Sequence, residues 1–254
     1  YHGLLVAAMR PPVERMLLLS SLDESLGGEM LANHQYPGTI YPQGFRHLEK
    51  FVTDPLPHFF YRTENSLLDK TVFMVHGENT TAVQYHVSGF SGLISIVPLI
   101  NCRSFHSAST PPKIEQEALK DGVRLKSSCD FCLFSNQGRY VRHDLTYYNM
   151  EYEEERQRGL PWKEDLFSPG RFEIEIDEEA SFCIVATVDR DSMPVADRLL
   201  KKELKRASSL KSSLEPPLDR LAIAADSFVV KRSTGKSIIA GYHWFDDWGR
   251  DTMI

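Results

Sequence analysis

The chain has 254 residues, of which 42% are hydrophobic and 25% charged, the balance of an ordinary globular protein. This composition excludes global disorder and collagen-like structure, and the length is enough to bury one large core or two smaller ones. Its 29 basic residues are outnumbered by 35 acidic ones, for a net charge of −6, so no overall field attracts it to nucleic acid or an anionic membrane surface.

The hydrophobic pattern of residues 1–190 predicts a series of short strands. Apolar runs of strand length alternate with turns that contain Pro, Gly, Asn or Asp. In Thr80–Val87 the apolar and polar residues alternate with a period of two, as a sheet with two different faces requires. Asn136-Gln137-Gly138 predicts a hairpin between the strands on either side of it. We therefore expect an antiparallel all-β sandwich, with strands at Leu4–Met9, Met16–Leu22, Leu67–Val75, Thr80–Val87, Leu93–Ile100, Phe131–Ser135, Arg139–His143, Phe172–Ile176 and Phe182–Val188.

The hydrophobic period becomes helical after this region. From Pro194 to Lys211 one face carries apolar residues and the rest is mostly basic, which is typical of an amphipathic linker helix. Two prolines after Glu215 end the helical pattern, and a second helix is predicted from Leu218. The stretch Lys231–Ser237 is polar and predicts a loop. We expect a β domain at 1–190, a helical linker at 191–217 and a helical region at 218–254. The apolar face of the first helix is predicted to be Ala196, Leu200, Leu204 and Ala207.

Three short patterns are weaker signals of chemistry. Ser233–Ser237 resembles the end of a phosphate-binding loop, but Val230 stands where that loop needs a glycine. Cys129 and Cys132 have the spacing of zinc ligands, but no second pair follows at a matching distance, which favours structural thiols. The carboxylates of Glu151–Asp165 are suited to general acid and base work, but the glycines and prolines around them favour a solvated loop.

The remaining composition points to a reducing, cytoplasmic location. Four cysteines are too few for a disulfide framework in a chain this long, and no signal-peptide pattern or membrane-length apolar run occurs. The nine histidines show no metal-ligand spacing. The chain begins at Tyr1 and stops at Ile254, directly after a dense aromatic and charged cluster. We therefore expect a fragment that is cut at both ends.

That cluster, Tyr242–Asp251, is the strongest functional signal. It holds two of the three tryptophans, three aspartates and one arginine within ten residues. Core packing favours apolar residues at one period and does not explain this mixture. Sugar recognition does explain it, because aromatic rings cover the apolar face of a pyranose and charged groups bind its hydroxyls. Arg250 and Asp251 would supply donors and an acceptor, and Gly249 lets the backbone turn tightly. The alternative is a buried, tryptophan-lined helix start with an Arg–Asp ion pair.

Two stretches, Ala224–Val230 and Ile238–Ile254, resemble the domain junction of archaeal and bacterial glycogen debranching enzymes of the amylo-α-1,6-glucosidase type. The resemblance implies an N-terminal β-supersandwich, similar to galactose mutarotase, followed by an (α/α)₆ barrel of which only the first segment is present. Further matches to the family lie in the β region, at Tyr1–Ala7, Pro98–Asn101, Arg103, His106, Arg158–Leu160, Glu164-Asp165 and Pro169-Gly170.

The resemblance also implies a site. Trp-Gly-Arg-Asp is similar to the segment of glucoamylases that binds the glucose on the non-reducing side of the scissile bond. By that match Arg250 and Asp251 hold hydroxyls of this glucose and Trp248 forms a wall of its subsite, with Trp244 and Asp247 as further members. The catalytic acid and base of the related barrels lie further along the chain, so no residue here is assigned either role.

The implied activity is hydrolysis of α-1,6-linked glucose at branch points of glycogen or limit dextrin by the full-length parent. It would need no cofactor and no metal, and its partner would be a branched α-glucan. The fragment alone is expected to be inactive, and the sequence does not fix the oligomeric state. Two other functions stay open: a non-catalytic glycan-binding or scaffolding β module, and a glucoamylase-like α-1,4-glucan hydrolase.

Overall fold

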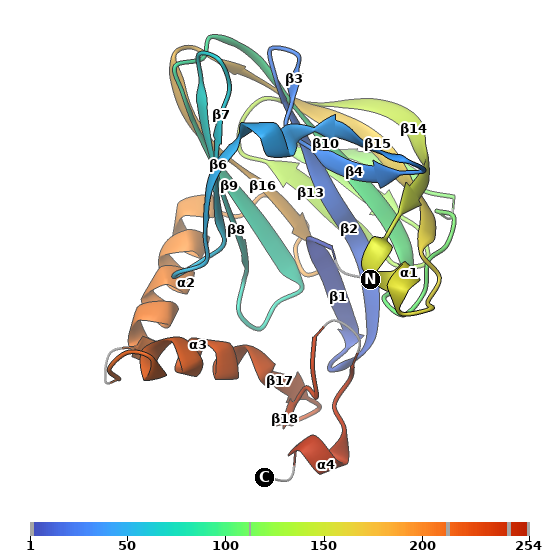
Figure 1. Ribbon diagram of the computed structural model, residues 1–254, viewed down its shortest axis with the longest axis vertical. Helices are drawn as coiled ribbons and strands as arrows, with labels where there is room; N and C mark the ends of the chain where they lie inside the picture. The colour runs from blue at the N-terminus through green and yellow to red at the C-terminus, as the bar shows by residue number, and fades with distance from the viewer. Residues whose placement is uncertain (1–2, 112, 212–213, 243–244, 253–254) are drawn as a thin grey trace.

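The computed structural model describes residues 3–111, 113–211, 214–242 and 245–252, with side chains described as far as Arg250. Two antiparallel sheets face each other (Figure 1). The strands of the smaller sheet are β1 (Leu5–Arg10), β2 (Val13–Leu26), β3 (Glu29–Met30), β10 (Gly92–Ser104), β14 (Arg139–Glu151) and β15 (Lys163–Ile176). Those of the larger sheet are β6 (Leu48–Val52), β7 (His58–Arg62), β8 (Leu67–Met74), β9 (Thr80–Ser88), β11 (Glu115–Leu119), β12 (Gly122–Lys126), β13 (Phe131–Ser135) and β16 (Glu179–Thr187).

Shorter elements complete the part of the chain that the structure describes. A small arm of two strands and a 3₁₀ turn follows β3, and a short helix lies between β14 and β15. Helices and a hairpin follow the sandwich. Their bounds are β4 (Asn33–Tyr36), β5 (Thr39–Gln43), η1 (Gly44–His47), α1 (Glu153–Gln157), α2 (Ala196–Lys211), α3 (Leu218–Phe228), β17 (Val229–Arg232), β18 (Gly235–Ile238) and α4 (Gly249–Thr252). None of these helices is long and apolar enough to cross a membrane.

The order of strands confirms the predicted sandwich. The smaller sheet runs β1-β2-β10-β15-β14, with β3 on β2, and the larger runs β11-β12-β13-β16-β9-β8-β7-β6. The strand pairs are antiparallel, as β8 and β9 are on either side of the turn at residues 75–79. The main core fills the space between the two sheets, where Tyr85 and Phe182 stack with ring centroids 4.9 Å apart and are fully buried.

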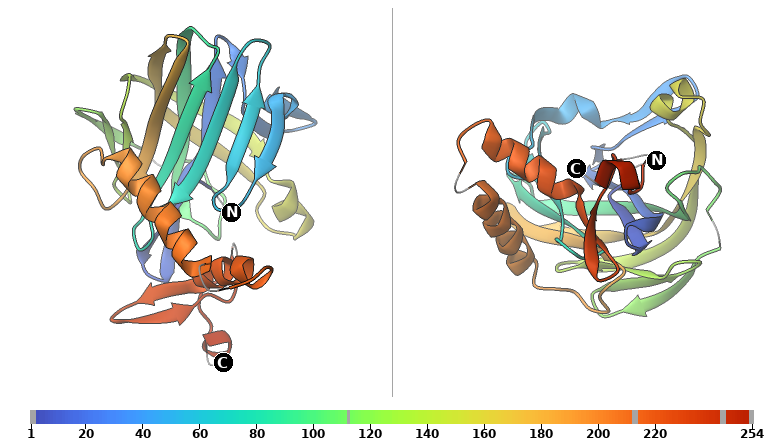
Figure 2. Two further views of the ribbon diagram at one scale, coloured as in Figure 1. Left: turned by 90° about the vertical axis from the view of Figure 1, so that its left-hand side faces the viewer. Right: turned by 90° about the horizontal axis from the view of Figure 1, so that it is seen from below.

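Helix α2 covers the outer face of the larger sheet (Figure 2). This is why β9 is buried on both faces: Val83 and Tyr85 point into the sandwich, whereas Ala82 lies under the helix. The buried stripe of α2 differs from the predicted one, because Leu204 is 38% exposed and Glu203 is buried. Glu203 is held there by the backbone N–H of His76, 3.0 Å from its Oε1, and by Arg206.

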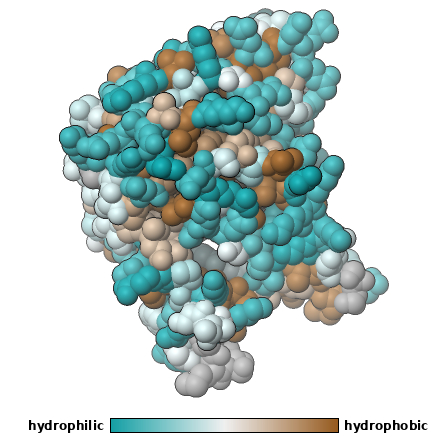
Figure 3. Space-filling model, turned by 180° about the vertical axis from the view of Figure 1, so that it is seen from behind, coloured by the Kyte–Doolittle hydropathy of each residue, from teal (hydrophilic) through white to brown (hydrophobic). Residues whose placement is uncertain are grey.

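Three local predictions were wrong. Asn136–Gly138 does not form a hairpin, because β13 pairs with β12 and β16 while β14 pairs with β15, so this turn crosses between sheets. The expected solvated loop at 151–165 contains α1 and the start of β15, with Glu155 and Glu164 buried. The expected loop at 231–237 is most of the β17–β18 hairpin, whose strands pair from Val229 to Ile238. Viewed from behind, the surface is mainly hydrophilic with separate apolar patches (Figure 3).

The pH dependence of stability is predicted to include a contribution from His143 on β14. Its Nε2 lies 2.6 Å from Ser168 Oγ, and its buried Nδ1 has no hydrogen-bond partner among the described residues. Burial, together with nearby Arg171, lowers the pKa of His143 below its usual value. Between about pH 6.5 and this lower pKa the unfolded chain binds a proton that the folded chain does not. This contribution is therefore fully present above about pH 6.5 and is lost as the pH falls through the folded pKa.

The test compares urea unfolding midpoints of the wild type and His143→Gln at about pH 7.5 and about pH 5.5, on either side of the ordinary histidine pKa. The wild type should lose more stability on acidification than the variant. An equal loss in both proteins would contradict the assignment.

Candidate functional site

The part of the aromatic and charged segment described from residue 245 onward lies at one end of the sandwich, with α3, the β17–β18 hairpin and α4 (Figure 1, and from below in Figure 2). Two backbone hydrogen bonds fix Phe245 and Asp246, one from Ala240 N to Asp246 O (3.1 Å) and one from Phe245 N to Gly241 O (3.1 Å). Trp248 follows directly and precedes α4, which begins at Gly249. The structure thus places Trp248 and Arg250 side by side at the start of a short helix.

Trp248 contacts Phe245 and Arg250 and is still partly exposed to solvent. It is 45% exposed, and its ring meets that of Phe245 nearly edge-on with centroids 5.3 Å apart. The guanidinium carbon of Arg250 lies 5.6 Å from the Trp248 ring centroid, within the range of a cation–π contact. The alternative of a buried tryptophan at this helix start therefore does not describe Trp248. A partly exposed indole beside a guanidinium is the combination that covers a sugar ring and holds its hydroxyls.

The carboxylate of Asp247 faces the β17–β18 hairpin. Its Oδ2 accepts hydrogen bonds from Arg232 Nη1 and from Ser237 Oγ, both at 2.7 Å, and its side chain is only 6% exposed. These contacts tie the segment to the two strands of the β17–β18 hairpin. Of the other predicted sugar contacts, Trp244 lies outside the described residues, and Asp251 is described by its backbone within α4.

Replacing Asp247 with alanine should loosen the hairpin, because Ser237 and Arg232 lose their common acceptor. Amide hydrogen exchange over residues 229–238 is expected to become faster, and exchange in the strands of the sandwich should stay unchanged. Oligosaccharide affinity measured on the same variant separates the two roles. Weaker binding with unchanged exchange would make Asp247 a sugar contact instead.

Arg15, near the start of β2, anchors the segment from the β domain. Its Nη2 donates to Phe245 O and to Asp246 Oδ1, the latter at 3.1 Å, and the residue is 6% exposed. Its guanidinium lies over the ring of Phe105, 3.8 Å from the centroid, and His106 Nε2 is 4.0 Å from Asp246 Oδ2. Sequence reasoning missed Arg15, and its one visible signal was a charged residue directly before an apolar run.

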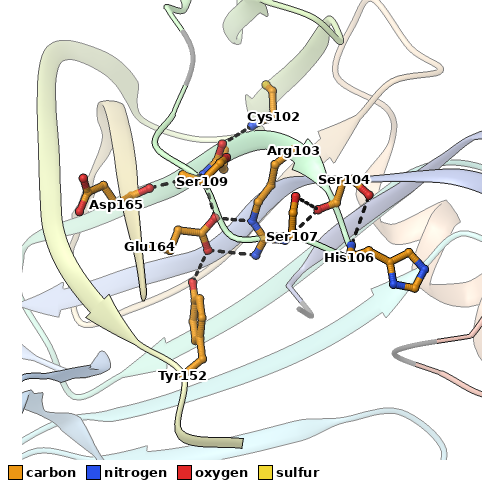
Figure 4. Close-up of polar contacts among 10 residues, drawn as sticks. Cys102, Arg103, Ser104, His106, Ser107, Ser109, Tyr152, Glu164 and Asp165 are labelled. Atoms are coloured by element: carbon orange, nitrogen blue, oxygen red, sulfur yellow. Dashed lines mark hydrogen bonds and ion pairs between the residues drawn. The ribbon is translucent and has the colours of Figure 1, made fainter. Parts of the chain in front are cut away.

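Arg103 and Glu164, two of the residues that carry the family resemblance, meet in a buried cluster (Figure 4). Arg103 Nε and Nη2 donate to the two oxygens of Glu164, Nη2 at 2.9 Å. Asn101 Nδ2 and the Tyr152 hydroxyl also donate to this carboxylate, at 2.8 and 2.6 Å. With all of these donors on one carboxylate, the cluster joins β10, β15 and the chain before α1, and it has no carboxyl group open to a substrate.

Neither the cysteine thiols nor the side chains that could bind a metal form a further reactive or metal site in the part of the chain that is described. No group of three or more His, Cys, Asp or Glu side chains lies close enough to hold a metal ion there. Burial raises the pKa of Cys102 to about 11 and also raises the pKa of Cys129 and Cys132. Thiols with raised pKa values are poor nucleophiles and poor metal ligands at neutral pH.

Two of the solved structures that match this chain are distant likenesses. A polysaccharide lyase is 10% identical, with a TM-score of 0.31 over 74% of this chain and 27% of the lyase. A protein assigned as a kojibiose phosphorylase from the human microbiome is 8% identical, with a TM-score of 0.36 over 83% of this chain and 27% of that protein. The chain thus spans about a quarter of the length of each. No curated protein matches it.

Comparison with protein families is specific. Residues 223–254 match the family described as amylo-alpha-1,6-glucosidase, and this stretch contains Trp248, Arg250 and the hairpin that holds Asp247. Residues 1–183, which include both sheets up to the middle of β16, match the family described as glycogen debranching enzyme N terminal. The chain therefore belongs to the glycogen debranching enzyme N-terminal family.

Proposed function

We propose that the chain is the N-terminal part of an enzyme that hydrolyses α-1,6-linked glucose at the branch points of glycogen or limit dextrin. Trp248, Arg250 and Asp251 line the subsite of the glucosyl residue that is released. The observation that carries the proposal is the partly exposed indole of Trp248, with the Arg250 guanidinium beside its ring, in a chain of this family.

The chemistry of this pair suits a neutral sugar. The exposed part of the indole covers the apolar C–H face of a pyranose, and the guanidinium supplies several donors in a fixed plane for neighbouring hydroxyls. Apart from its two chain neighbours, no described atom lies within 4 Å of a Cβ atom added at Gly249, so the start of α4 is not packed against the rest of the described chain at this point.

The acid and base of the reaction are proposed to lie outside the described residues. Inverting hydrolysis needs two carboxyl groups roughly 6.5–9.5 Å apart, one to protonate the leaving oxygen and one to activate water. Asp246 is engaged by Arg15, and Asp247 is engaged by Arg232 and Ser237. Because both carboxylates already bind cations of this chain, neither is assigned the acid or the base. By resemblance to the family, these groups follow Ile254.

The experiment measures glucose released by the full-length protein from a phosphorylase-trimmed branched dextrin and from linear maltooligosaccharides. Release from the branched substrate, with little from the linear ones, is the expected result. Release from the linear substrates alone would overturn the branch specificity and favour an α-1,4-glucan hydrolase. Binding of oligosaccharide without any release would favour a glycan-binding module. The 254-residue chain by itself serves as the control and should release no glucose.

A further inference from the structure

We propose that Arg15 is a positioning residue for the glucose subsite, through which the β domain sets the place of the Trp248 indole. The proposal rests on the function proposed above for Trp248 and names the residue that orients it. Arg15 touches neither Trp248 nor Arg250 in the described contacts. It acts on the two residues of the segment that come shortly before Trp248.

The first support is the pairing of Arg15 with the backbone. Its Nη2 donates to the carbonyl oxygen of Phe245 and to Oδ1 of Asp246, which is 3.1 Å away. A bond to a main-chain carbonyl fixes the path of the chain itself, and not only one side chain. The two partners lie 230 and 231 residues from Arg15, so the contact joins the two ends of the chain.

The second support is the rigid setting of the guanidinium. Its carbon atom lies 3.8 Å from the Phe105 ring centroid and 6.0 Å from that of Tyr242. The backbone of Arg15 is fixed as well, because its carbonyl oxygen accepts a hydrogen bond of 3.1 Å from Phe105 N. A stacked and hydrogen-bonded guanidinium holds its donors in one plane and direction, as a lysine ammonium on a flexible stem does not.

The third support is an unpaired donor. Arg15 is 6% exposed, yet its buried Nε has no hydrogen-bond partner among the described residues. A buried polar atom without a partner opposes folding, so packing alone would favour an apolar side chain at this position. The contacts made by Nη2 give a reason for an arginine here.

The link from Arg15 to the subsite is short. Phe245, whose carbonyl Arg15 holds, meets Trp248 ring to ring with centroids 5.3 Å apart. Movement of the Phe245 backbone therefore moves the support of the indole. Displacement of a substrate-positioning group by about 1 Å lowers rates by up to about 100-fold, because the reacting groups lose their alignment.

The test uses Arg15→Ala and Arg15→Lys in the full-length protein. Arg10→Ala is the matched control, because Arg10 lies on the same hairpin, is 72% exposed at its side chain and pairs with Glu14. With branched dextrin, kcat/KM of Arg15→Ala should fall by about 10- to 100-fold, mostly in kcat. Arg15→Lys should be intermediate, and Arg10→Ala should match the wild type. Added methylguanidinium should restore part of the activity of Arg15→Ala, and sodium chloride at equal ionic strength should not.

A second readout does not depend on activity. Amide hydrogen exchange over residues 238–250 should become faster in Arg15→Ala and stay unchanged in Arg10→Ala. Wild-type kcat/KM in Arg15→Ala overturns the proposal. So does a loss of activity that follows a fall in Tm and is not restored by methylguanidinium, because Arg15 would then be merely structural. If the wild type releases no glucose, the proposed function fails, and exchange alone decides whether Arg15 positions this segment: faster exchange supports that role and unchanged exchange overturns it.

Discussion

Replacing Glu164 with alanine is expected to lower the free energy of unfolding by about 3–5 kcal/mol, the cost of breaking a buried ion pair by removing one partner. The side chains of Arg103 and Glu164 are 2% and 0% exposed. Without the carboxylate, the Arg103 guanidinium stays buried and loses its paired acceptor of opposite charge. Asn101 and Tyr152 each lose an acceptor at the same time. The measurement is urea unfolding of the chain, with the expected shift in the midpoint and no change in the slope.

Two variants distinguish this effect from a general loss of charge. Glu153→Ala removes an exposed carboxylate that pairs with Arg156, and it should change stability little, because solvent screens such pairs. The double variant Arg103→Met/Glu164→Leu should recover much of the lost stability, because an apolar pair of similar size needs no desolvation of charge. A wild-type unfolding midpoint in Glu164→Ala would contradict the prediction.

Replacing Arg250 with alanine in the full-length protein is expected to lower kcat/KM for branched dextrin by about 10- to 100-fold, the contribution of a hydrogen bond from a charged donor. Arg250 is exposed on α4 beside Trp248, so Tm should stay unchanged. Asp251→Ala should give a loss of similar size if its carboxylate holds a hydroxyl of the same glucose. Arg250→Lys should fall between the wild type and alanine, because it keeps the charge and loses the planar fork.

Lys231→Ala is the matched control for Arg250, since Lys231 is an exposed cation on the nearby β17–β18 hairpin. Its kcat/KM should equal that of the wild type. A similar loss in Lys231→Ala and Arg250→Ala would indicate a general effect of positive charge on substrate binding. Full activity in Arg250→Ala would remove Arg250 from the subsite.

The fold class was predictable from the sequence because it depends on local signals. Alternation in Thr80–Val87 marks a strand with two different faces, and β9 is a strand over Thr80–Ser88. Strand partners are a different matter, since they depend on contacts across the whole domain. Gly138 belongs to a good local turn, yet a Cβ there would lie 2.1 Å from the Glu173 carbonyl oxygen of β15. The glycine thus serves a close approach to β15 and not a hairpin to β13.

The candidate site was predictable in the same limited way. An unusual local mixture of aromatics and charges drew attention to Trp248 and Arg250, and the structure places them side by side. Their neighbour Asp247 has the same composition signal, but its carboxylate faces the hairpin. The sequence alone does not show whether an aspartate side chain faces the protein or a ligand, because the same residue type can bind a protein cation or a sugar hydroxyl. For Arg15 the local signal, a charge directly before an apolar run, does not point to the site, because its partners lie 230 and 231 residues away.

The pairing of β9 with β16 has a consequence for the synthesis of the protein. Thr80 and Thr187 face each other across these strands and are 107 residues apart in the chain. A ribosome that adds about 5–20 residues per second needs roughly 5–20 s to make the intervening chain. During these seconds one edge of β9 has no native partner, and unpaired strand edges are sites of aggregation. Nascent chains should therefore need the most protection by chaperones between the emergence of β9 and that of β16, and faster translation of residues 89–178 should increase the soluble yield.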